Sequence, residues 1–211
     1  MNKELFIEEL NKLGINVTED QLSKLNKFYK LLIEWNEKIN LTRITEENEV
    51  YLKHFYDSLT IKKVIDLNEV ETLCDVGTGA GFPGIVLKIM YPHLKITLVD
   101  SLQKRVNYLN SIIKDLELED IHAIHSRGED FKEKFDVVTA RAVANIEKLV
   151  TYTMHLLNKD GQLVAMKGNI EEELTESVQQ KLSKKYQIKK IEKFFLPIEE
   201  SHRSLVVLKN K

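Results

Sequence analysis

Hydrophobic residues recur at three- and four-residue spacing through the first third of the chain. Residues 3–13 place their apolar side chains on one helical face, and Gly14 suits the position just after a helix end. Residues 18–39 repeat the pattern over a longer stretch, which opens with a Thr-x-x-Gln capping box. Thr45 is placed to cap a third helix. We therefore predict an N-terminal helical cap over residues 1–66.

From residue 70 onward, short apolar runs alternate with helical patterns. This alternation predicts a parallel sheet with right-handed crossovers. The predicted strands are 71–76, 95–100, 121–125, 135–140 and 162–166, the last entered through a turn at 159–161. The predicted helices are 84–91, 102–115, 145–157 and 170–183. Two β-prone runs, 186–196 and 204–208, predict a terminal antiparallel hairpin. The expected fold is α/β, a mostly parallel seven-stranded sheet over residues 67–211, which forms one compact unit with the cap.

Composition indicates a soluble globular protein. The chain of 211 residues is 43% hydrophobic and 30% charged. Its first residues carry no long apolar run, so no signal peptide is expected, and no stretch approaches the ~20 apolar residues of a membrane span. The single cysteine, Cys74, rules out a disulfide within the chain and fits a reducing compartment. These features together predict a cytoplasmic protein.

A glycine-rich turn from Asp75 to Gly84 joins the first predicted strand to a helix. Such a turn lets a ligand approach backbone N–H groups at the positive end of a helix dipole. The register Gly79-x-Gly-x-x-Gly84 fits the dinucleotide fingerprint. A second register, Asp75-x-Gly77-x-Gly79-x-Gly81, fits the turn of S-adenosylmethionine (SAM) methyltransferases. The second register also explains an acid at the strand end, where it suits the amine of a methionine moiety.

The next predicted strand ends in Asp100, about 20 residues after the glycines, where a ribose diol needs an acceptor. This position supports a nucleoside cofactor of either kind. The acid at Asp75 and the antiparallel last strand favour SAM over NAD. We therefore assign Asp75, Gly79 and Asp100 to a SAM site, with NAD as the alternative.

Polar residues follow the other predicted strands as well, on the rim where open α/β sheets bind ligands. Arg141 ends the fourth strand. A fixed cation there can orient the methionine carboxylate or a phosphate, so Arg141 is the candidate catalytic residue, with a positioning role. The six histidines show no zinc-like spacing, and no metal is expected.

The end of the fourth strand also limits the reaction. Methyltransferases of exocyclic base amines usually carry Asn/Asp-Pro-Pro-aromatic at this place, and the motif is missing. Methylation of pyrimidine C5 needs a cysteine nucleophile, but Cys74 lies in a buried strand. No glutamates are paired as protein arginine methylation requires. Substrates that are already nucleophilic remain, and guanine N7 is the clearest, because its methylation needs positioning and electrostatics more than a base.

The helical cap contains a cluster of polar residues that packing alone does not explain. The cluster comprises Asn36, Asn40, His54, Asp57 and Ser58. We expect the cluster to face the active site, where all but Asn36 would contact RNA.

The C-terminal end is the basic part of a chain whose net charge is −2. Residues 181–211 hold nine Lys/Arg against three Asp/Glu, so this end could bind phosphates. We predict that Arg203, beside His202, holds an RNA phosphate, and that Lys167 does so from the fifth strand. The alternative for Arg203 is a surface salt bridge to Glu199 or Glu200, which would contribute little.

Motifs spread over nearly the whole chain resemble one family. They are Trp35-Asn-x3-Asn-Leu-Thr42, His54-x2-Asp-Ser58, the turn Asp75–Gly84, Ser126-Arg-Gly-Glu129, Thr139-Ala-Arg-Ala142, Lys167-Gly168 and His202-Arg-x-Leu-Val-Val207. The glycine motif alone is class-wide, but Gly-Phe-Pro-Gly together with His-x2-Asp-Ser is specific. The chain resembles the bacterial 16S ribosomal RNA guanine-N7 methyltransferases, the small-subunit methyltransferase G family, also called glucose-inhibited division protein B.

The resemblance implies the class I SAM-dependent methyltransferase fold, which is Rossmann-like, with SAM as methyl donor. It implies a substrate guanine near the decoding centre of 16S rRNA, in the small ribosomal subunit or its assembly intermediate. It implies cofactor contacts at Gly77, Phe82, Gly128, Glu129 and Arg141. Asp100 stands where the family has glutamate, and Gly128 where alanine is usual. Two other functions stay open: a SAM methyltransferase of a small molecule, and a non-catalytic nucleotide-binding module.

Overall fold

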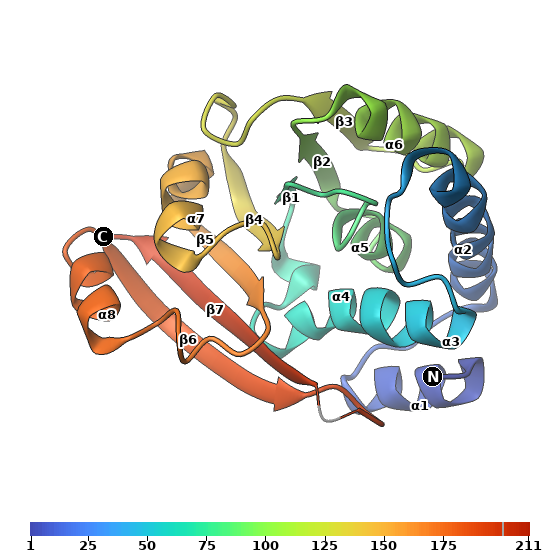
Figure 1. Ribbon diagram of the computed structural model, residues 1–211, viewed down its shortest axis with the longest axis horizontal. Helices are drawn as coiled ribbons and strands as arrows, with labels where there is room; N and C mark the ends of the chain where they lie inside the picture. The colour runs from blue at the N-terminus through green and yellow to red at the C-terminus, as the bar shows by residue number, and fades with distance from the viewer. Residues whose placement is uncertain (200) are drawn as a thin grey trace.

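A seven-stranded sheet forms the centre of the computed structural model, which describes residues 1–199 and 201–211. The strand order is β3-β2-β1-β4-β5-β7-β6 (Figure 1). The strands are β1 (Thr72–Val76), β2 (Lys95–Asp100), β3 (Ile121–His125), β4 (Phe135–Arg141), β5 (Leu157–Lys167), β6 (Tyr186–Phe195) and β7 (His202–Asn210). Strands β1 to β5 are parallel, and β7 runs antiparallel to both β5 and β6. The predicted sheet and its terminal antiparallel hairpin are confirmed.

Helices cover both faces of the sheet (Figure 1). On one face lie α1 (Lys3–Lys12), α2 (Glu19–Ile39), α5 (Gly84–Met90) and α6 (Gln103–Asp115). They are joined there by a continuous helical segment, 47–63, made of α3 (Glu47–Val50), the π-helical η1 (Tyr51–Tyr56), α4 (Asp57–Leu59) and the 3₁₀ turn η2 (Thr60–Lys63). The other face carries α7 (Ile146–Thr153), the 3₁₀ turn η4 (Met154–Leu156) and α8 (Glu176–Ser183). A further 3₁₀ turn, η3 (Leu67–Glu69), precedes β1. Side chains alternate along each strand, so Leu73 enters the first core and Cys74 the second.

The N-terminal helices share one apolar core with the sheet. Phe28 of α2 and Phe55 of η1 are fully buried and stack at 5.7 Å between ring centroids. Phe28 also lies 5.4 Å from Phe82 of the glycine turn. Aromatic pairs at these distances stabilise by about 0.5–1.5 kcal/mol beyond their burial. The cap is therefore held against the turn, while its division from the sheet as a unit of residues 1–66 stays a prediction.

Local sequence explains both ends of α2. The Thr18 hydroxyl accepts the N–H of Gln21 at 3.2 Å, and the Gln21 side chain accepts the N–H of Thr18 at 2.9 Å, which is the predicted capping box. Asn40 ends the helix with a φ of +49°. Asn36 Oδ1 then accepts the N–H groups of residues 41–42 at 2.6 and 2.8 Å. Asn36 therefore directs the following loop toward the carboxyl ends of the strands.

Three local predictions are wrong. Thr45 caps no helix, because α3 begins only at Glu47. The turn predicted at 159–161 lies inside β5, where the register against β4 shifts and the extra residues form a bulge. The helix predicted over 170–183 begins at Glu176. The Thr175 side chain caps the helix there and accepts the N–H of Val178 at 3.5 Å.

Candidate active site

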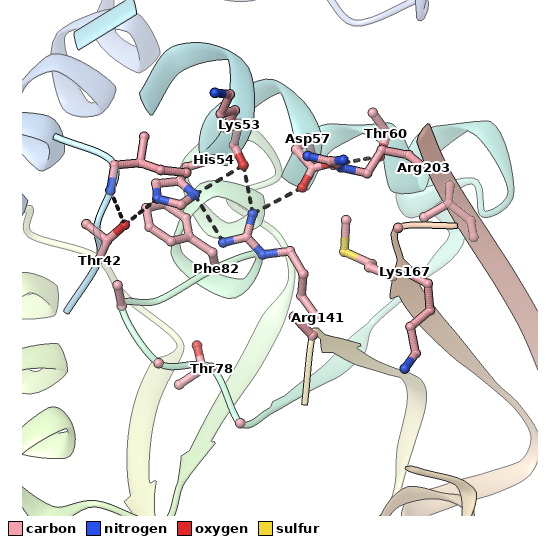
Figure 2. A pocket seen from close by; sticks show the side chains of 18 of the residues that line it. Thr42, Lys53, His54, Asp57, Thr60, Thr78, Phe82, Arg141, Lys167 and Arg203 are labelled. Carbon is pink, nitrogen blue, oxygen red and sulfur yellow. Dashed lines mark hydrogen bonds and ion pairs between the residues drawn. The ribbon is translucent and has the colours of Figure 1, made fainter. Parts of the chain in front are cut away.

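A cavity of about 500 Å³ opens where the carboxyl ends of β1 and β4 meet the cap and β7 (Figure 2). We call it the main cavity. Residues 77–80 of the glycine turn line it, as do His54 and Asp57 from the cap, Arg141 from β4 and Arg203 from β7. The antiparallel course of β7 thus brings Arg203 to the same rim as the glycine turn, as expected. His54 and Asp57 face the site, as the polar cluster predicted.

Asp75 holds the glycine turn from inside the protein and does not line the main cavity. Its carboxylate accepts the hydroxyls of Thr78 at 2.7 Å and Thr139 at 3.2 Å, and the N–H of Gly84 at 2.8 Å. Burial raises the pKa of Asp75 to about 6, and these donors oppose the shift. The predicted contact of Asp75 with the methionine amine is corrected: a fully buried, internally bonded carboxylate shapes the turn instead.

Three glycines of the turn adopt backbone that favours glycine. Gly77, Gly79 and Gly81 have φ values of +69°, +59° and +93°. A Cβ on Gly79 would meet only a carbonyl oxygen at 3.9 Å, so it would point into the main cavity. A Cβ on Gly77 would lie 2.7 Å from Val143 Cγ2. The turn therefore offers bare backbone to a ligand at Gly79.

A smaller cavity, which we call the side cavity, lies on the other side of Gly77. Its walls are apolar at Val99, Leu102 and Val143, and Glu129 adds a carboxylate beside Gly128. Gly77 lines both cavities. An elongated cofactor with an apolar, flat base at one end and a charged group at the other fits this pair. The predicted contacts at Gly77, Gly128 and Glu129 remain predictions that this arrangement supports.

Asp100 lines neither cavity, but it bonds Gly79, which lines the main cavity, and Leu102, which lines the side cavity. Its oxygens accept the N–H groups of Gly79 and Leu102, both at 2.9 Å, and Arg105 lies at 3.5 Å. Only 2% of Asp100 is exposed. Asp100 already accepts two backbone donors, so only its remaining lone pairs could accept the hydroxyls of a ribose. Its contact with a ribose stays a prediction.

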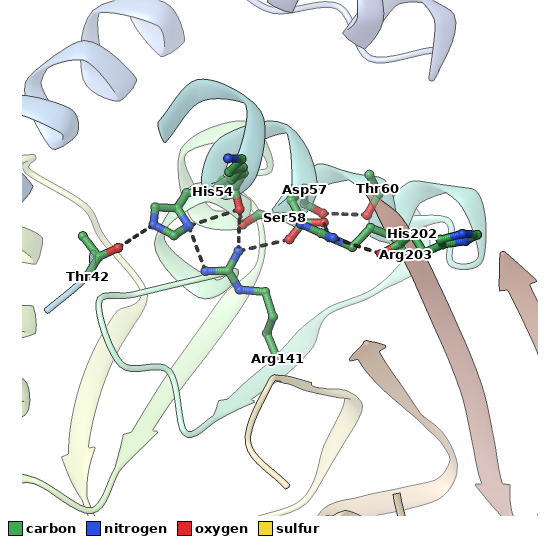
Figure 3. Close-up of polar contacts among 9 residues, drawn as sticks. Thr42, His54, Asp57, Ser58, Thr60, Arg141, His202 and Arg203 are labelled. Atoms are coloured by element: carbon green, nitrogen blue, oxygen red, sulfur yellow. Dashed lines mark hydrogen bonds and ion pairs between the residues drawn. The ribbon is translucent and has the colours of Figure 1, made fainter. Parts of the chain in front are cut away.

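One carboxylate joins two arginines above the main cavity (Figure 3). Asp57 Oδ2 accepts Arg141 Nη1 at 3.2 Å, and Asp57 Oδ1 accepts Arg203 Nε at 2.9 Å. Arg141 also donates to the carbonyl of Lys53 at 3.0 Å. Two guanidinium groups on one carboxylate leave a net positive charge, which suits an anion such as a carboxylate or phosphate. Glu199 pairs with Lys53 and not with Arg203, and Glu200 lies outside the described residues.

His54 is a neutral, buried ring in this network. Nε2 lies 2.9 Å from the Thr42 hydroxyl, and the ring stacks on Phe82 at 4.4 Å (Figure 2). Arg141 lies 5.1 Å from the Phe82 ring centroid, which is a cation–π distance. Burial, with the charge of Arg141, lowers the pKa of His54 to about 3. The imidazole therefore stays uncharged at neutral pH and is a weak base there.

Three residues predicted to bind RNA have other roles or places. Ser58 is fully buried and donates to the carbonyl of His54 at 2.5 Å. The ammonium of Lys167 points away from Arg141, into the loop after β4, and pairs with Glu173 at 2.9 Å (Figure 2). Asn40 is exposed but does not line the main cavity. Burial against an internal partner corrects Ser58, whereas Lys167 lines the main cavity and its contact with RNA stays a prediction.

His202 remains accessible at the start of β7, beside the exposed Phe195, with ring centroids 4.3 Å apart. Its contact with RNA stays a prediction. Sequence reasoning missed Thr42, Leu102 and Val143, which line the cavities. The motif around Thr42 signalled the first of these, whereas nothing local marks the other two.

No group of His, Cys, Asp and Glu within residues 1–199 and 201–211 is arranged to hold a metal ion. Over the same residues, no helix combines the length and apolarity needed to cross a membrane.

The chain is similar to solved methyltransferases over most of its length. A SAM dependent methyltransferase from Aquifex aeolicus covers 83% of this chain and 97% of its own, with a TM-score of 0.58 and 16% identity. The ribosomal protein L11 methylase from Lactobacillus delbrueckii subsp. bulgaricus covers 80% and 81%, with a TM-score of 0.56 and 18% identity. The fold is thus that of class I SAM-dependent methyltransferases, as predicted, and not the parallel six-stranded NAD fold.

Relatives of known name match the full chain. The ribosomal RNA small subunit methyltransferase G of Exiguobacterium sibiricum is 46% identical over 100% of this chain and 92% of its own. The enzyme of the same name from Bacillus subtilis (strain 168) is 45% identical over 99% and 90%. The family model GidB, described as rRNA small subunit methyltransferase G, matches residues 21–206. The family match and these identities, together with the site geometry, show that the chain belongs to the rRNA small subunit methyltransferase G family.

Proposed function

We propose that this protein transfers the methyl group of SAM to N7 of a guanine in 16S rRNA, near the decoding centre. The substrate is the small ribosomal subunit or its assembly intermediate in the cytoplasm. Family membership makes the protein an rRNA methyltransferase that uses SAM. One observation carries the finer proposal: the main cavity holds fixed cations and a stacked ring pair, while His54 is neutral and Asp57 is fully engaged by arginines.

The cofactor side follows from the two cavities that meet at Gly77. Leu102 and Val143 offer apolar contact to an adenine in the side cavity, and Glu129 an acceptor for its amine. The bare backbone at Gly79 borders the methionine end in the main cavity. SAM supplies an electrophilic methyl group on a sulfonium sulfur.

The substrate side needs no base for this chemistry. The lone pair of guanine N7 forms the new bond to the methyl carbon, while the sulfur–carbon bond breaks and its electrons return to sulfur. N7 carries no proton, so none has to be removed, and the purine becomes cationic. Arg141 and Arg203, fixed by Asp57, can hold the phosphate of the target nucleotide. Phe82 and His54 offer an adjacent stacked surface.

The direct test is methyl transfer in vitro. The purified protein is incubated with labelled SAM and small subunits from a strain that lacks the gene, and 7-methylguanine is mapped in the 16S rRNA. We expect one new modified guanine near the decoding centre. Subunits from a strain that has the gene are the control, since their site is already methylated. SAM binding without any transfer to rRNA would favour a small-molecule substrate instead.

A further inference from the structure

Lys167 lines the main cavity, but its ammonium is paired with Glu173 and turned away from Arg141 (Figure 2). Lys167 ends β5, and only 8% of the residue is exposed. Its ammonium donates to the carbonyl of Ala144 and to Glu173 Oε2, the latter at 2.9 Å. Removing a buried lysine from such partners to meet a phosphate would leave the carboxylate unpaired, which is costly. The lysine is therefore engaged with its own chain.

The same carboxylate also holds the far end of the loop after β4. Glu173 Oε2 accepts the N–H of Ile146 at 3.0 Å. One ion pair thus fixes two points, Ala144 and Ile146, on the segment 142–146. That segment begins with Ala142 at a φ of +54°, a conformation that an alanine rarely adopts without support. The ion pair holds the residues that follow Ala142 in this segment, at Ala144 and Ile146.

Between these fixed points, the loop forms a wall of both cavities. Ala142 lines the main cavity and Val143 lines the side cavity. Val143 Cγ2 lies against the bare Cα of Gly77, 2.7 Å from where a Cβ would stand. Gly77 is where the two cavities meet. A cofactor that occupies both cavities has to pass beside this valine.

We propose that Lys167 and Glu173 are positioning residues of the SAM site, and not RNA contacts. They hold residues 142–146 so that Val143 forms the wall at Gly77 that a bound cofactor contacts. The proposal rests on the proposed function, in that SAM is the molecule that fills both cavities.

The test compares Lys167→Met, Glu173→Ala and Glu173→Gln with the wild type. Methionine keeps the stem of lysine without its charge, and the glutamine amide oxygen can still accept both donors. We expect Lys167→Met and Glu173→Ala to weaken SAM binding about tenfold in equilibrium dialysis. Their KM for SAM should rise more than kcat falls. Glu173→Gln should restore affinity to within about threefold of wild type. The salt slope of RNA binding should not change.

Matched controls come from an exposed pair, Lys193 and Glu171, whose charges lie 2.9 Å apart. Lys193→Met and Glu171→Ala should leave SAM affinity unchanged. A lysine that binds RNA predicts the opposite pattern for Lys167→Met: unchanged SAM affinity and a salt slope lower by about one unit. That pattern, or unchanged SAM affinity in folded Lys167→Met and Glu173→Ala, would overturn the proposal. Absence of SAM binding by the wild type would instead overturn the proposed function.

Discussion

Asp57 is the residue that sets the charge of the main cavity. It was expected to contact RNA, yet each of its oxygens accepts one arginine and only 4% of the residue is exposed. Its effect on a substrate is therefore indirect, through Arg141 and Arg203. Because one negative charge holds two positive ones, the cluster keeps its geometry and still attracts an anion.

Gly79→Val is predicted to abolish SAM binding in a protein that still folds. The new side chain would project into the main cavity and resist the positive φ. Gly14→Val is a matched control, since Gly14 also has a positive φ, +72°, with nothing within 4 Å of its Cβ position. Both variants should lose about 1–2 kcal/mol of unfolding free energy. Equilibrium dialysis should show lost SAM affinity in Gly79→Val alone, and equal affinities would place the cofactor elsewhere.

Arg203→Ala is predicted to weaken RNA methylation at physiological salt and to leave SAM affinity unchanged. Arg203 reaches the main cavity from β7, while Asp57 stays paired with Arg141 in the variant. One lost phosphate contact should lower the salt slope of RNA binding by about one unit. The measurement is RNA affinity over a salt series. An unchanged slope with full methylation at limiting RNA would leave Arg203 with a structural role only.

At the scale of elements, the π-helical η1 shapes the substrate side. Wide π turns are rare and frequently lie at functional sites. Here the carbonyls of Lys53 and His54 accept side-chain donors, from Arg141 and Ser58 respectively. The element therefore gives the cap a direct hydrogen bond to the end of β4. It also turns the ring of His54 onto Phe82.

Ser58→Ala is predicted to lower the unfolding free energy by about 1 kcal/mol, because it removes the buried hydrogen bond of the hydroxyl while the His54 carbonyl keeps the Asp57 N–H as a donor. RNA affinity and SAM affinity should stay within about threefold of wild type. Thr153→Val in α7 is the matched control, since its buried hydroxyl donates to the Leu149 carbonyl at 2.7 Å. Urea unfolding and RNA binding are measured on both. Weaker RNA binding by a Ser58→Ala protein of wild-type stability would restore its predicted RNA contact.

At the scale of the whole molecule, two buried groups make stability depend on pH with opposite signs. The pKa of Asp75 rises from its ordinary 3.8 to about 6 in the folded protein. The stabilisation that this shift provides is fully present below pH 3.8 and is lost as the pH rises through 6. The pKa of His54 falls to about 3. The contribution of His54 to stability is fully present above pH 6.5, its ordinary pKa. It is lost as the pH falls toward 3, because in this range only the unfolded chain binds the proton.

His54→Gln is predicted to remove the second of these dependences. Between pH 7.5 and 5.5, wild type should lose about 1.4 kcal/mol of unfolding free energy relative to the variant. The contribution of Asp75 cancels in this difference, since both proteins keep it. Urea unfolding of the two proteins at each pH gives the number. Parallel pH curves would mean that His54 titrates normally in the folded protein.

Local patterns in the sequence determined the sheet, the order of its elements and the rim on which we propose that the cofactor binds. A two-residue period fixes which strand residues face each core, and positive φ at Gly77 and Gly79 is a local demand of the turn. Strand ends then gather on one rim because the strands are parallel. These are properties of neighbouring residues, so Arg141 and Arg203 could be assigned to that rim before any contact was known.

Tertiary structure alone decided what each polar side chain does there. Asp57 and Arg141 are 84 residues apart, and Lys167 meets a glutamate whose position depends on where α8 begins. In the sequence, an aspartate such as Asp75 or a serine such as Ser58 looks the same whether its side chain faces a ligand or an internal hydrogen-bond partner. A charged or hydroxyl group takes whichever partner the fold buries beside it, because leaving it unpaired costs more than any local preference. That partner comes from distant sequence, where no local pattern reports it.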